Sequence, residues 1–330
     1  MPRIVVIGAS QGGVQALQTL VSGLGTKVGA PILIVLHVGG AQSILPSILS
    51  DIDGIKASHP VDRERIQPGQ IYVAPPDHHM LVTDGHIELS RGPRENWARP
   101  AIDPLFRSAA ESYGPEAIGV VLSGRLNDGT AGLYEIKRRG GTAIVQTPSD
   151  AESPDMPRSA LENVPVDYCL PVGEMPRLLI RLAGESLRQR SQIVHGGGVM
   201  EPKIESPSAQ TCPECGGAMR EESIGKLTRF RCHIGHMMTA EVLAAQQVES
   251  LENDFSALLR RLNERTGLCR EIADKHFANG NHHTGETWSR AAEESAGREI
   301  AAQQLVRAEW VHPEDGGGKE EPAAEEKEEA

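Results

Sequence analysis

Three side chains of kinds that cooperate in ester hydrolysis follow three short apolar runs of the sequence. The first is Ser10, which lies in the Gly-x-Ser-x-Gly segment Gly8–Gly12, directly after the run Ile4–Ile7. This pattern is typical of a nucleophile elbow, in which a serine projects from a sharp turn between a strand and a helix. A phosphate-binding turn at a helix N-terminus is the alternative. The dinucleotide fingerprint Gly-x-Gly-x-x-Gly is not met, because position 10 is serine.

A serine hydroxyl is a weak nucleophile and needs a neighbouring base. His37 follows the apolar run Ile32–Leu36, and Asp128 lies in the loop after Ile118–Leu122. An Asp in this position has a structural alternative, since it can cap the helix that follows. Its catalytic use is to orient the imidazole. Because functional groups gather at the carboxyl ends of strands in an open α/β sheet, the three residues predict a Ser-His-Asp hydrolase site.

A second chemical motif lies further along the chain. Cys212, Cys215, Cys232 and His236 form the pattern C-x2-C-x16-C-x3-H. Two such pairs supply the four ligands of a tetrahedral Zn²⁺ site, so we expect a structural zinc ion and no cofactor for catalysis. His233 is the alternative fourth ligand, and unliganded reduced thiols are the alternative to a metal site. The module has no basic patch, so we expect partner docking rather than nucleic-acid binding.

The elements that position the first three residues read as one α/β domain over residues 1–183. Continuous apolar runs of this kind are typical of strands buried on both faces of a parallel sheet. Helical patterns fall between several of them, which predicts a doubly wound, mostly parallel sheet. The predicted strands and helices are Ile4–Ile7, Ile32–Leu36, Gln70–Ala74, Ile118–Leu122 and Thr142–Val145, with Val14–Leu24, Pro104–Tyr113 and Ala131–Arg139.

Four further segments are expected after this domain. Residues 184–211 read as a linker, and 212–238 as a small zinc-ribbon-like module. Residues 239–311 read as a helical hairpin, in which apolar residues from Val248 to Leu262 recur at helical spacing and face a partner helix. Residues 312–330 read as a disordered acidic tail.

Composition excludes several classes of protein. The chain carries 33 Lys and Arg against 45 Asp and Glu, a net charge of −12, which argues against a nucleic-acid partner. No apolar run of about 18 residues exists, so membrane insertion is not expected. The N-terminus lacks a signal-peptide pattern, and a cytoplasmic location is therefore expected.

Six motifs follow one another along the α/β domain: Ile7–Gly13, the run ending in His37, Val73–Met80, Arg99–Asp103, Leu122–Gly129 and Met156–Arg158. In this order they resemble the catalytic domain of the CheB family of chemotaxis protein-glutamate methylesterases. The resemblance covers about residues 1–182, and it implies that Ser10, His37 and Asp128 are the catalytic residues. It also implies hydrolysis of glutamate γ-methyl esters on the cytoplasmic helices of chemoreceptors, with methanol as a product, and in some relatives glutamine deamidation.

The sequence also departs from the familiar form of this family. It shows no N-terminal receiver domain, and its extension resembles the zinc-ribbon extension of some stand-alone relatives. Gln11 stands where relatives often have a smaller residue, and Asn127 stands where an acid is common. For the oxyanion we expect the backbone N–H of Gln11 as the first donor and a second donor from the 123–129 loop. Gly12 and Arg99 are the other residues expected at the oxyanion site or the substrate cleft, with Arg99 at the cleft edge.

Two other functions remain as alternatives. In one, the α/β domain is a catalytically idle scaffold, and the zinc ribbon with its helices docks a signalling partner. In the other, the glycine-rich first turn binds a nucleotide. The nucleotide hypothesis lacks the acidic residue that should follow at a strand end about 20 residues later.

Overall fold

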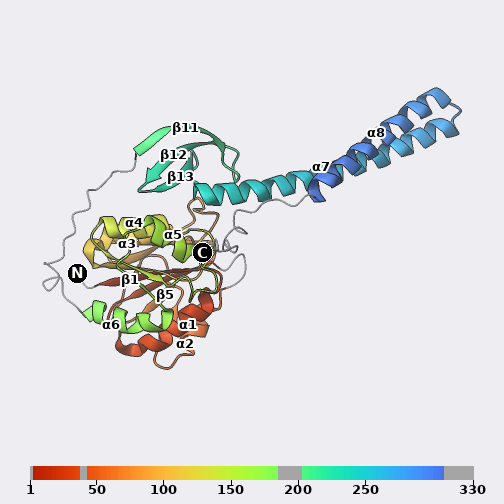
Figure 1. Cartoon of the computed structure of the whole chain (residues 1–330). Helices are drawn as coiled ribbons and strands as arrows, with labels where there is room; N and C mark the ends of the chain where they lie inside the picture. Colours follow the sequence, from red (N-terminus) through yellow and green to blue (C-terminus); the bar gives the residue numbers. More distant parts are fainter. Residues whose placement is uncertain (1–2, 38–42, 185–202, 308–330) are drawn as a thin grey trace, which may run out of the picture. The chain divides into compact units, whose positions relative to one another are not determined.

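The computed structural model describes residues 3–37, 43–184 and 203–307 of the chain (Figure 1). The chain divides into two compact units, Met1–Leu243 and Ala244–Ala330. Among the described helices, none combines the length and the apolar character that a bilayer crossing requires. The predicted acidic tail 312–330 and most of the predicted linker lie outside the described residues.

A seven-stranded parallel sheet forms the centre of the first unit, which confirms the predicted fold class. The central strands are buried along their whole length, as expected for apolar runs covered on both faces. In spatial order the strands are β10 (Tyr168–Leu170), β9 (Thr142–Gln146), β8 (Ala117–Val121), β1 (Ile4–Ala9), β2 (Ile32–Leu36), β5 (Ile71–Val73) and β3 (Ala57–Ser58).

The order of these strands reverses next to β1. From β1 the chain adds β2 on one side, and it later returns to add β8 on the other side. The carboxyl ends of strands at such a switch point are the usual place for a binding site in a doubly wound sheet. Ser10 follows β1 at this point.

Helices cover both faces of the sheet and bury its two apolar cores (Figure 1). One face carries α1 (Gly13–Leu24), α2 (Leu45–Ser50) and α6 (Met175–Gly184), and the other carries α3 (Ile102–Tyr113), α4 (Thr130–Arg138) and α5 (Asp155–Asn163). A small antiparallel sheet and three short 3-10 helices complete the domain: β4 (Glu64–Arg65), β6 (His79–Thr83), β7 (His86–Ser90), η1 (Gly25–Lys27), η2 (Gly114–Glu116) and η3 (Val172–Glu174).

The Cys/His module is an antiparallel four-stranded sheet, and it begins earlier than predicted. Its strands are β11 (Lys203–Thr211), β12 (Ala218–Ile224), β13 (Leu227–Cys232) and β14 (Met237–Thr239). The prediction of a linker was therefore wrong over residues 203–211. β11 is an edge strand that pairs with β12 through its backbone and shifts register around Pro207, so it carries no apolar period to reveal it.

Two long helices follow, as predicted. α7 spans Ala240–Ala278 and α8 spans His282–Arg307, and Arg265 Nε donates to Ser295 Oγ between them at 3.1 Å. The apolar residues predicted to face a partner helix are buried only in part, because Leu251 and Leu258 are 41% and 44% exposed.

Candidate active site and metal centre

Ser10 and His37 are side by side because their strands are neighbours in register. Ala9 of β1 pairs with Leu36 of β2, and His37 N–H donates to Ala9 O at 3.2 Å. On the other side, Ser10 N–H donates to Ser123 O, after β8, at 2.9 Å. Within the described chain, the Ser10 hydroxyl makes no hydrogen bond with His37. Such contacts often close only when substrate binds.

The imidazole of His37 is held by Asp128. His37 Nε2 lies 2.8 Å from Asp128 Oδ2, and this leaves Nδ1 as the nitrogen that can accept a proton from a nucleophile. The same carboxylate accepts the backbone N–H of Ile102 at 2.7 Å, at the start of α3. The side chain thus binds the first turn of α3. It does not cap α4, the helix that follows it, because Gly129 is the N-cap of that helix.

Two buried carboxyls of this region have opposite pKa shifts. Burial by itself raises the pKa of Asp128, but the hydrogen bond and charge of His37 and the donors Ile102 N and Asn96 Nδ2 outweigh it and lower that pKa. Burial, together with the negative charge of Asp128, raises the pKa of Asp103 to about 7. Asp128 is therefore kept ionised, as a carboxylate that orients an imidazole must be.

Asn96 is a site residue that the sequence analysis missed. Its Nδ2 donates to Asp128 Oδ1 at 2.8 Å and to Asp103 Oδ2 at 2.9 Å, so it bridges the two carboxyls. Its backbone φ is 48°, in the left-handed region that Asn tolerates better than most residues. No local pattern marks it, because its partner Asp128 is 32 residues away.

The turn after β1 has the form of an elbow. Gly12 has a φ of 74° and is the N-cap of α1. Among the described residues, no acceptor faces the amides of Gln11 and Gly12. Ser123, also missed from sequence, donates its buried hydroxyl to Gln11 O at 2.7 Å and accepts Ser153 N–H at 2.9 Å. It thereby fixes the backbone beside Ser10.

A pocket of about 420 Å³ opens beside the serine. It is lined by Ser10, Gly12, Val14, Gln15, Gln18 and Glu152. Arg99, expected at the cleft edge, does not line this pocket. Its guanidinium binds Asp77 at 2.6 Å and Gly92 O at 2.8 Å, and its hydrogen bond to Asp77 lowers the pKa of that carboxyl.

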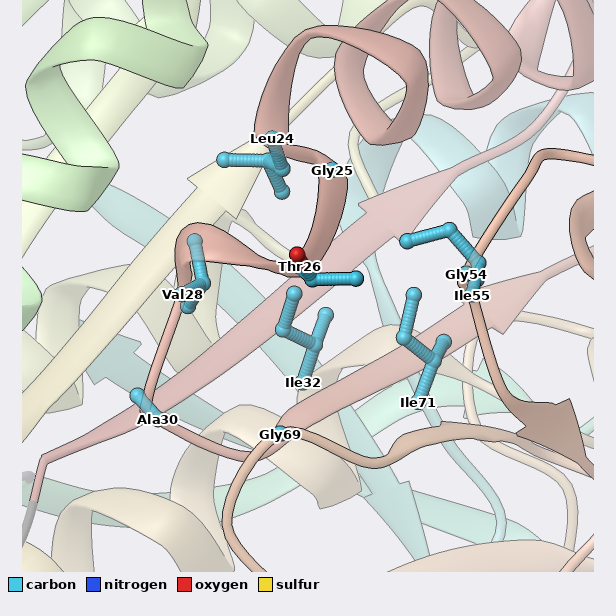
Figure 2. Close-up of a pocket in the computed structure, with 10 residues that line it drawn as sticks. All are labelled: Leu24, Gly25, Thr26, Val28, Ala30, Ile32, Gly54, Ile55, Gly69 and Ile71. Atoms are coloured by element: carbon cyan, nitrogen blue, oxygen red, sulfur yellow. The ribbon is translucent and has the colours of Figure 1, made fainter.

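A second, smaller pocket of about 70 Å³ lies at the opposite end of the strands (Figure 2). Ile32 and Ile71, the first residues of β2 and β5, line it together with the end of α1. Thr26 supplies its one side-chain oxygen, as Figure 2 shows. The residues that line this pocket include no titratable side chain that could act as an acid or a base or activate the Thr26 hydroxyl.

The structure brings together the four predicted metal ligands. Their donor atoms all lie within 4.8 Å of one another, and His236 is the histidine of the group, not His233. His236 Nδ1 lies 3.6 Å from Cys212 Sγ and 3.5 Å from Cys232 Sγ, and Cys215 Sγ lies 3.7 Å from Cys232 Sγ. A tetrahedron with Zn–S bonds of about 2.3 Å has edges of about 3.8 Å, so the spacing fits zinc.

Glu214 connects this cluster with the α/β domain. Its Oε2 lies 2.8 Å from Nε2 of His236, the ring nitrogen that faces away from the thiols. Its Oε1 lies 3.3 Å from Nη1 of Arg94. A carboxylate behind a ligating histidine is the usual arrangement around protein-bound zinc, because it fixes the ring orientation.

Comparison with known proteins identifies relatives of the α/β domain. A protein-family model described as CheB methylesterase matches residues 5–179. The crystal structure of the Thermotoga maritima CheB methylesterase catalytic domain is similar, with a TM-score of 0.53 and 33% identity, covering 55% of this chain and 99% of that one. The Cys/His module and the long helices lie beyond the residues that the family model matches.

Proteins of known sequence extend this similarity. "Putative protein-glutamate methylesterase/protein-glutamine glutaminase" of Leptospira interrogans is 43% identical over 188 residues, 56% of this chain and 97% of that protein. "Protein-glutamate methylesterase/protein-glutamine glutaminase" of Nitrobacter winogradskyi is 37% identical over 194 residues, 57% of this chain and 46% of that protein. The chain thus spans nearly all of the first relative and about half of the second.

Proposed function

Because the chain belongs to the CheB methylesterase family, a family of carboxylic ester hydrolases, we propose that it hydrolyses glutamate γ-methyl esters on a protein substrate with Ser10 as the nucleophile. One observation carries this proposal. Ser10 and His37 follow paired residues of adjoining strands, and His37 Nε2 lies 2.8 Å from the buried carboxylate of Asp128. This is the constellation that activates a serine hydroxyl.

The proposed reaction has two steps. Ser10 Oγ attacks the ester carbonyl carbon while His37 Nδ1 takes the hydroxyl proton, and the tetrahedral intermediate then expels methanol, which receives that proton. Water, deprotonated by His37, attacks the resulting acyl-serine ester. The bond between the acyl carbon and Ser10 Oγ breaks, and His37 returns the proton to Oγ. The products are an unesterified glutamate side chain on the substrate protein and the Ser10 hydroxyl.

A carboxylate that contacts His37 and backbone amides that follow Ser10 support this chemistry. Asp128, whose pKa is lowered, stays ionised and stabilises the imidazolium that forms in each step. The amides of Gln11 and Gly12, at the start of α1, have no acceptor among the described residues and can donate to the oxyanion. Amide donors at a helix N-terminus are suited to developing negative charge.

The substrate class is carried by the relatives rather than by the pocket. Their names pair methylesterase with glutaminase activity, so methylated glutamates and glutamines of chemoreceptor-type cytoplasmic helices are the proposed substrates. The proposal therefore also places the chain in the cytoplasm. The pocket beside Ser10, about 420 Å³, has room for a glutamyl side chain.

Methanol release tests this function. The full chain is incubated with a methylated chemoreceptor cytoplasmic fragment, and the unmethylated fragment serves as the control. We expect methanol from the methylated fragment only, and a fluorophosphonate should label Ser10 in peptide mapping. Absence of both methanol and label would instead support the alternative, a catalytically idle scaffold that docks a partner.

We also propose that Cys212, Cys215, Cys232 and His236 hold a structural Zn²⁺. The donor spacing and the carboxylate of Glu214 behind His236 support this assignment. With all four positions taken by protein ligands, the ion is structural and leaves no open site for catalysis.

Metal analysis of matched variants tests the zinc site. The full chain should contain about one zinc ion, and His236→Ala and Cys232→Ser should contain far less. His233→Ala and Cys169→Ser change the same residue types outside the cluster and should keep the metal. Equal zinc in His233→Ala and His236→Ala, or none in the unchanged chain, would contradict the assignment.

A further inference from the structure

We infer that the Cys/His module supports catalysis from outside the active site, because its strand β14 holds Asn96 and Asn127 in place beside Asp128. The inference rests on the proposed Ser-His-Asp function and extends it. It makes Asn96 a positioning residue for the reaction. It also makes the rate of a serine esterase depend on a metal ion that does not touch the substrate.

The first link is between β14 and the loop around Asn96. Asn96 N–H donates to Met237 O at 2.8 Å, and Met237 N–H donates to Arg94 O at 3.3 Å. Thr239 N–H donates to Asn96 Oδ1 at 3.3 Å. Because the amide oxygen of Asn96 is engaged in this way, its Nδ2 is turned toward Asp128 Oδ1, 2.8 Å away. The rotamer of this side chain is therefore set by the module.

The second link is to the residue next to Asp128. Thr239 Oγ1 donates to Asn127 Oδ1 at 2.8 Å, and Asn127 Nδ2 donates to Glu241 Oε2 at 2.8 Å. Thr239 is fully buried and Asn127 is 3% exposed, so the bond between these two residues is shielded from water, whereas Glu241 is exposed. Both ends of the Asn127 amide are bound by residues that follow the metal cluster.

The loops that carry Asn96 and Asn127 have strained backbone conformations, which need support from neighbouring structure. Asn96, Trp97 and Leu126 have φ values of 48°, 62° and 59°, in the left-handed region that costs a bulky residue energy. Trp97 and Leu126 both pack against the apolar core of the module, a cluster that includes Met219 and Met238. Strained conformations persist where neighbouring structure over-determines them, and here that structure is the module.

The metal ligands directly adjoin the docking strand. His236 precedes β14 by one position, and Cys232 ends β13, the strand that pairs with β14. Glu214 adds a third connection, since it contacts both His236 and Arg94. Metal binding should therefore order the strand that holds Asn96, because small metal modules of this kind depend on their ion to fold.

Substitutions that spare the metal ligands test the link. Asn96→Gly tolerates the left-handed backbone but removes the amide, and Thr239→Val removes the hydroxyl that reaches Asn127. The free energy lost with a hydrogen bond to a charged or buried partner corresponds to a fall in rate of about 10- to 100-fold. We expect a fall of that size in kcat for Asn96→Gly, a smaller fall for Thr239→Val, and unchanged KM and zinc content.

Matched controls separate positioning from general damage. Thr239→Ser keeps the hydroxyl and should restore kcat, and Thr228→Val removes a hydroxyl on β13 that has no hydrogen-bond partner in the described chain. A downfield imidazole N–H resonance, assigned by its loss in His37→Gln, reports the bond between His37 and Asp128. It should weaken or shift in Asn96→Gly and stay unchanged in Thr228→Val.

Removal and return of zinc complete the experiment. A chelator should slow fluorophosphonate labelling of Ser10 by about 10-fold or more, and added Zn²⁺ should restore the rate. Two results together would overturn the inference. Zinc removal would change neither the labelling rate of Ser10 nor the His37 resonance, and Thr239→Val would have the same kcat as the natural chain. Zinc-dependent labelling in a chain that releases no methanol from the methylated fragment would support the inference and reject the proposed substrate.

Discussion

Ser10→Ala is expected to lower the rate of methanol release by about 10⁵- to 10⁶-fold, the largest effect that any single substitution in this chain should have. The substitution removes the only atom that forms the acyl-enzyme, while His37 and Asp128 remain in contact. Activity that persists should be close to the uncatalysed rate, with the small residual assistance that oxyanion donors provide.

The fold of this variant should be intact. Ser10 follows a fully buried strand, and its hydroxyl makes no hydrogen bond within the described chain. The free energy of unfolding should therefore change by less than about 0.5 kcal/mol. Ser47→Ala, at an exposed position on α2, is the matched control and should keep full activity. Undiminished methanol release by Ser10→Ala, measured on chain purified in the same way, would show that another group is the nucleophile.

Asp128→Asn is expected to have the second largest effect, a fall in kcat of about 10³- to 10⁴-fold. An amide at this position presents an N–H or a neutral oxygen to His37 Nε2, so the imidazole is held in the wrong tautomer or is no longer stabilised as a cation. KM should change little, because Asp128 is buried and has no contact with the pocket beside Ser10.

The same variant should also lose stability in a pH-dependent manner. Asp128 accepts N–H groups from Ile102, Gly129 and Asn96, and an Asn side chain cannot satisfy all of these donors. The pKa of Asp128 is lower in the folded chain than its unfolded value of about 3.8. Asp128 therefore adds to the free energy of unfolding above about pH 3.8, and this contribution is lost as pH falls through the folded pKa. The stability difference between the natural chain and the variant should therefore shrink below about pH 4.

Asp103 changes the free energy of unfolding with pH in the opposite direction, and it does so at higher pH. Its folded pKa is raised to about 7, so its contribution is complete below about pH 3.8 and is lost as pH rises through 7. Because the charge of Asp128 helps to raise this pKa, Asp128→Asn should flatten the decline between pH 4 and 7. Urea unfolding at several pH values measures both windows, and Asp84→Asn, in an exposed turn with a φ of 49°, is the control. Parallel pH profiles for the natural chain and Asp128→Asn would contradict this account.

The sequence by itself determined the parts of this protein that have a local signature. Continuous apolar runs predicted the strands of the parallel sheet, because a strand buried on both faces needs such a run. Since parallel strands share one carboxyl edge, the residues that follow three of them, Ser10, His37 and Asp128, were predicted to meet. The cysteine spacing likewise predicted the cluster, because Cys-x-x-Cys brings two thiols together within one turn.

Only the tertiary structure decided which residues support these groups. Asn96 reaches Asp128 across 32 residues, and Asn127 reaches Thr239 across 112, so no periodicity or spacing records either contact. The pairing of Arg99 with Asp77 and the edge strand β11 are of the same kind. Each depends on where a distant backbone comes to lie, and that position is set by packing of the whole fold rather than by the residues nearby.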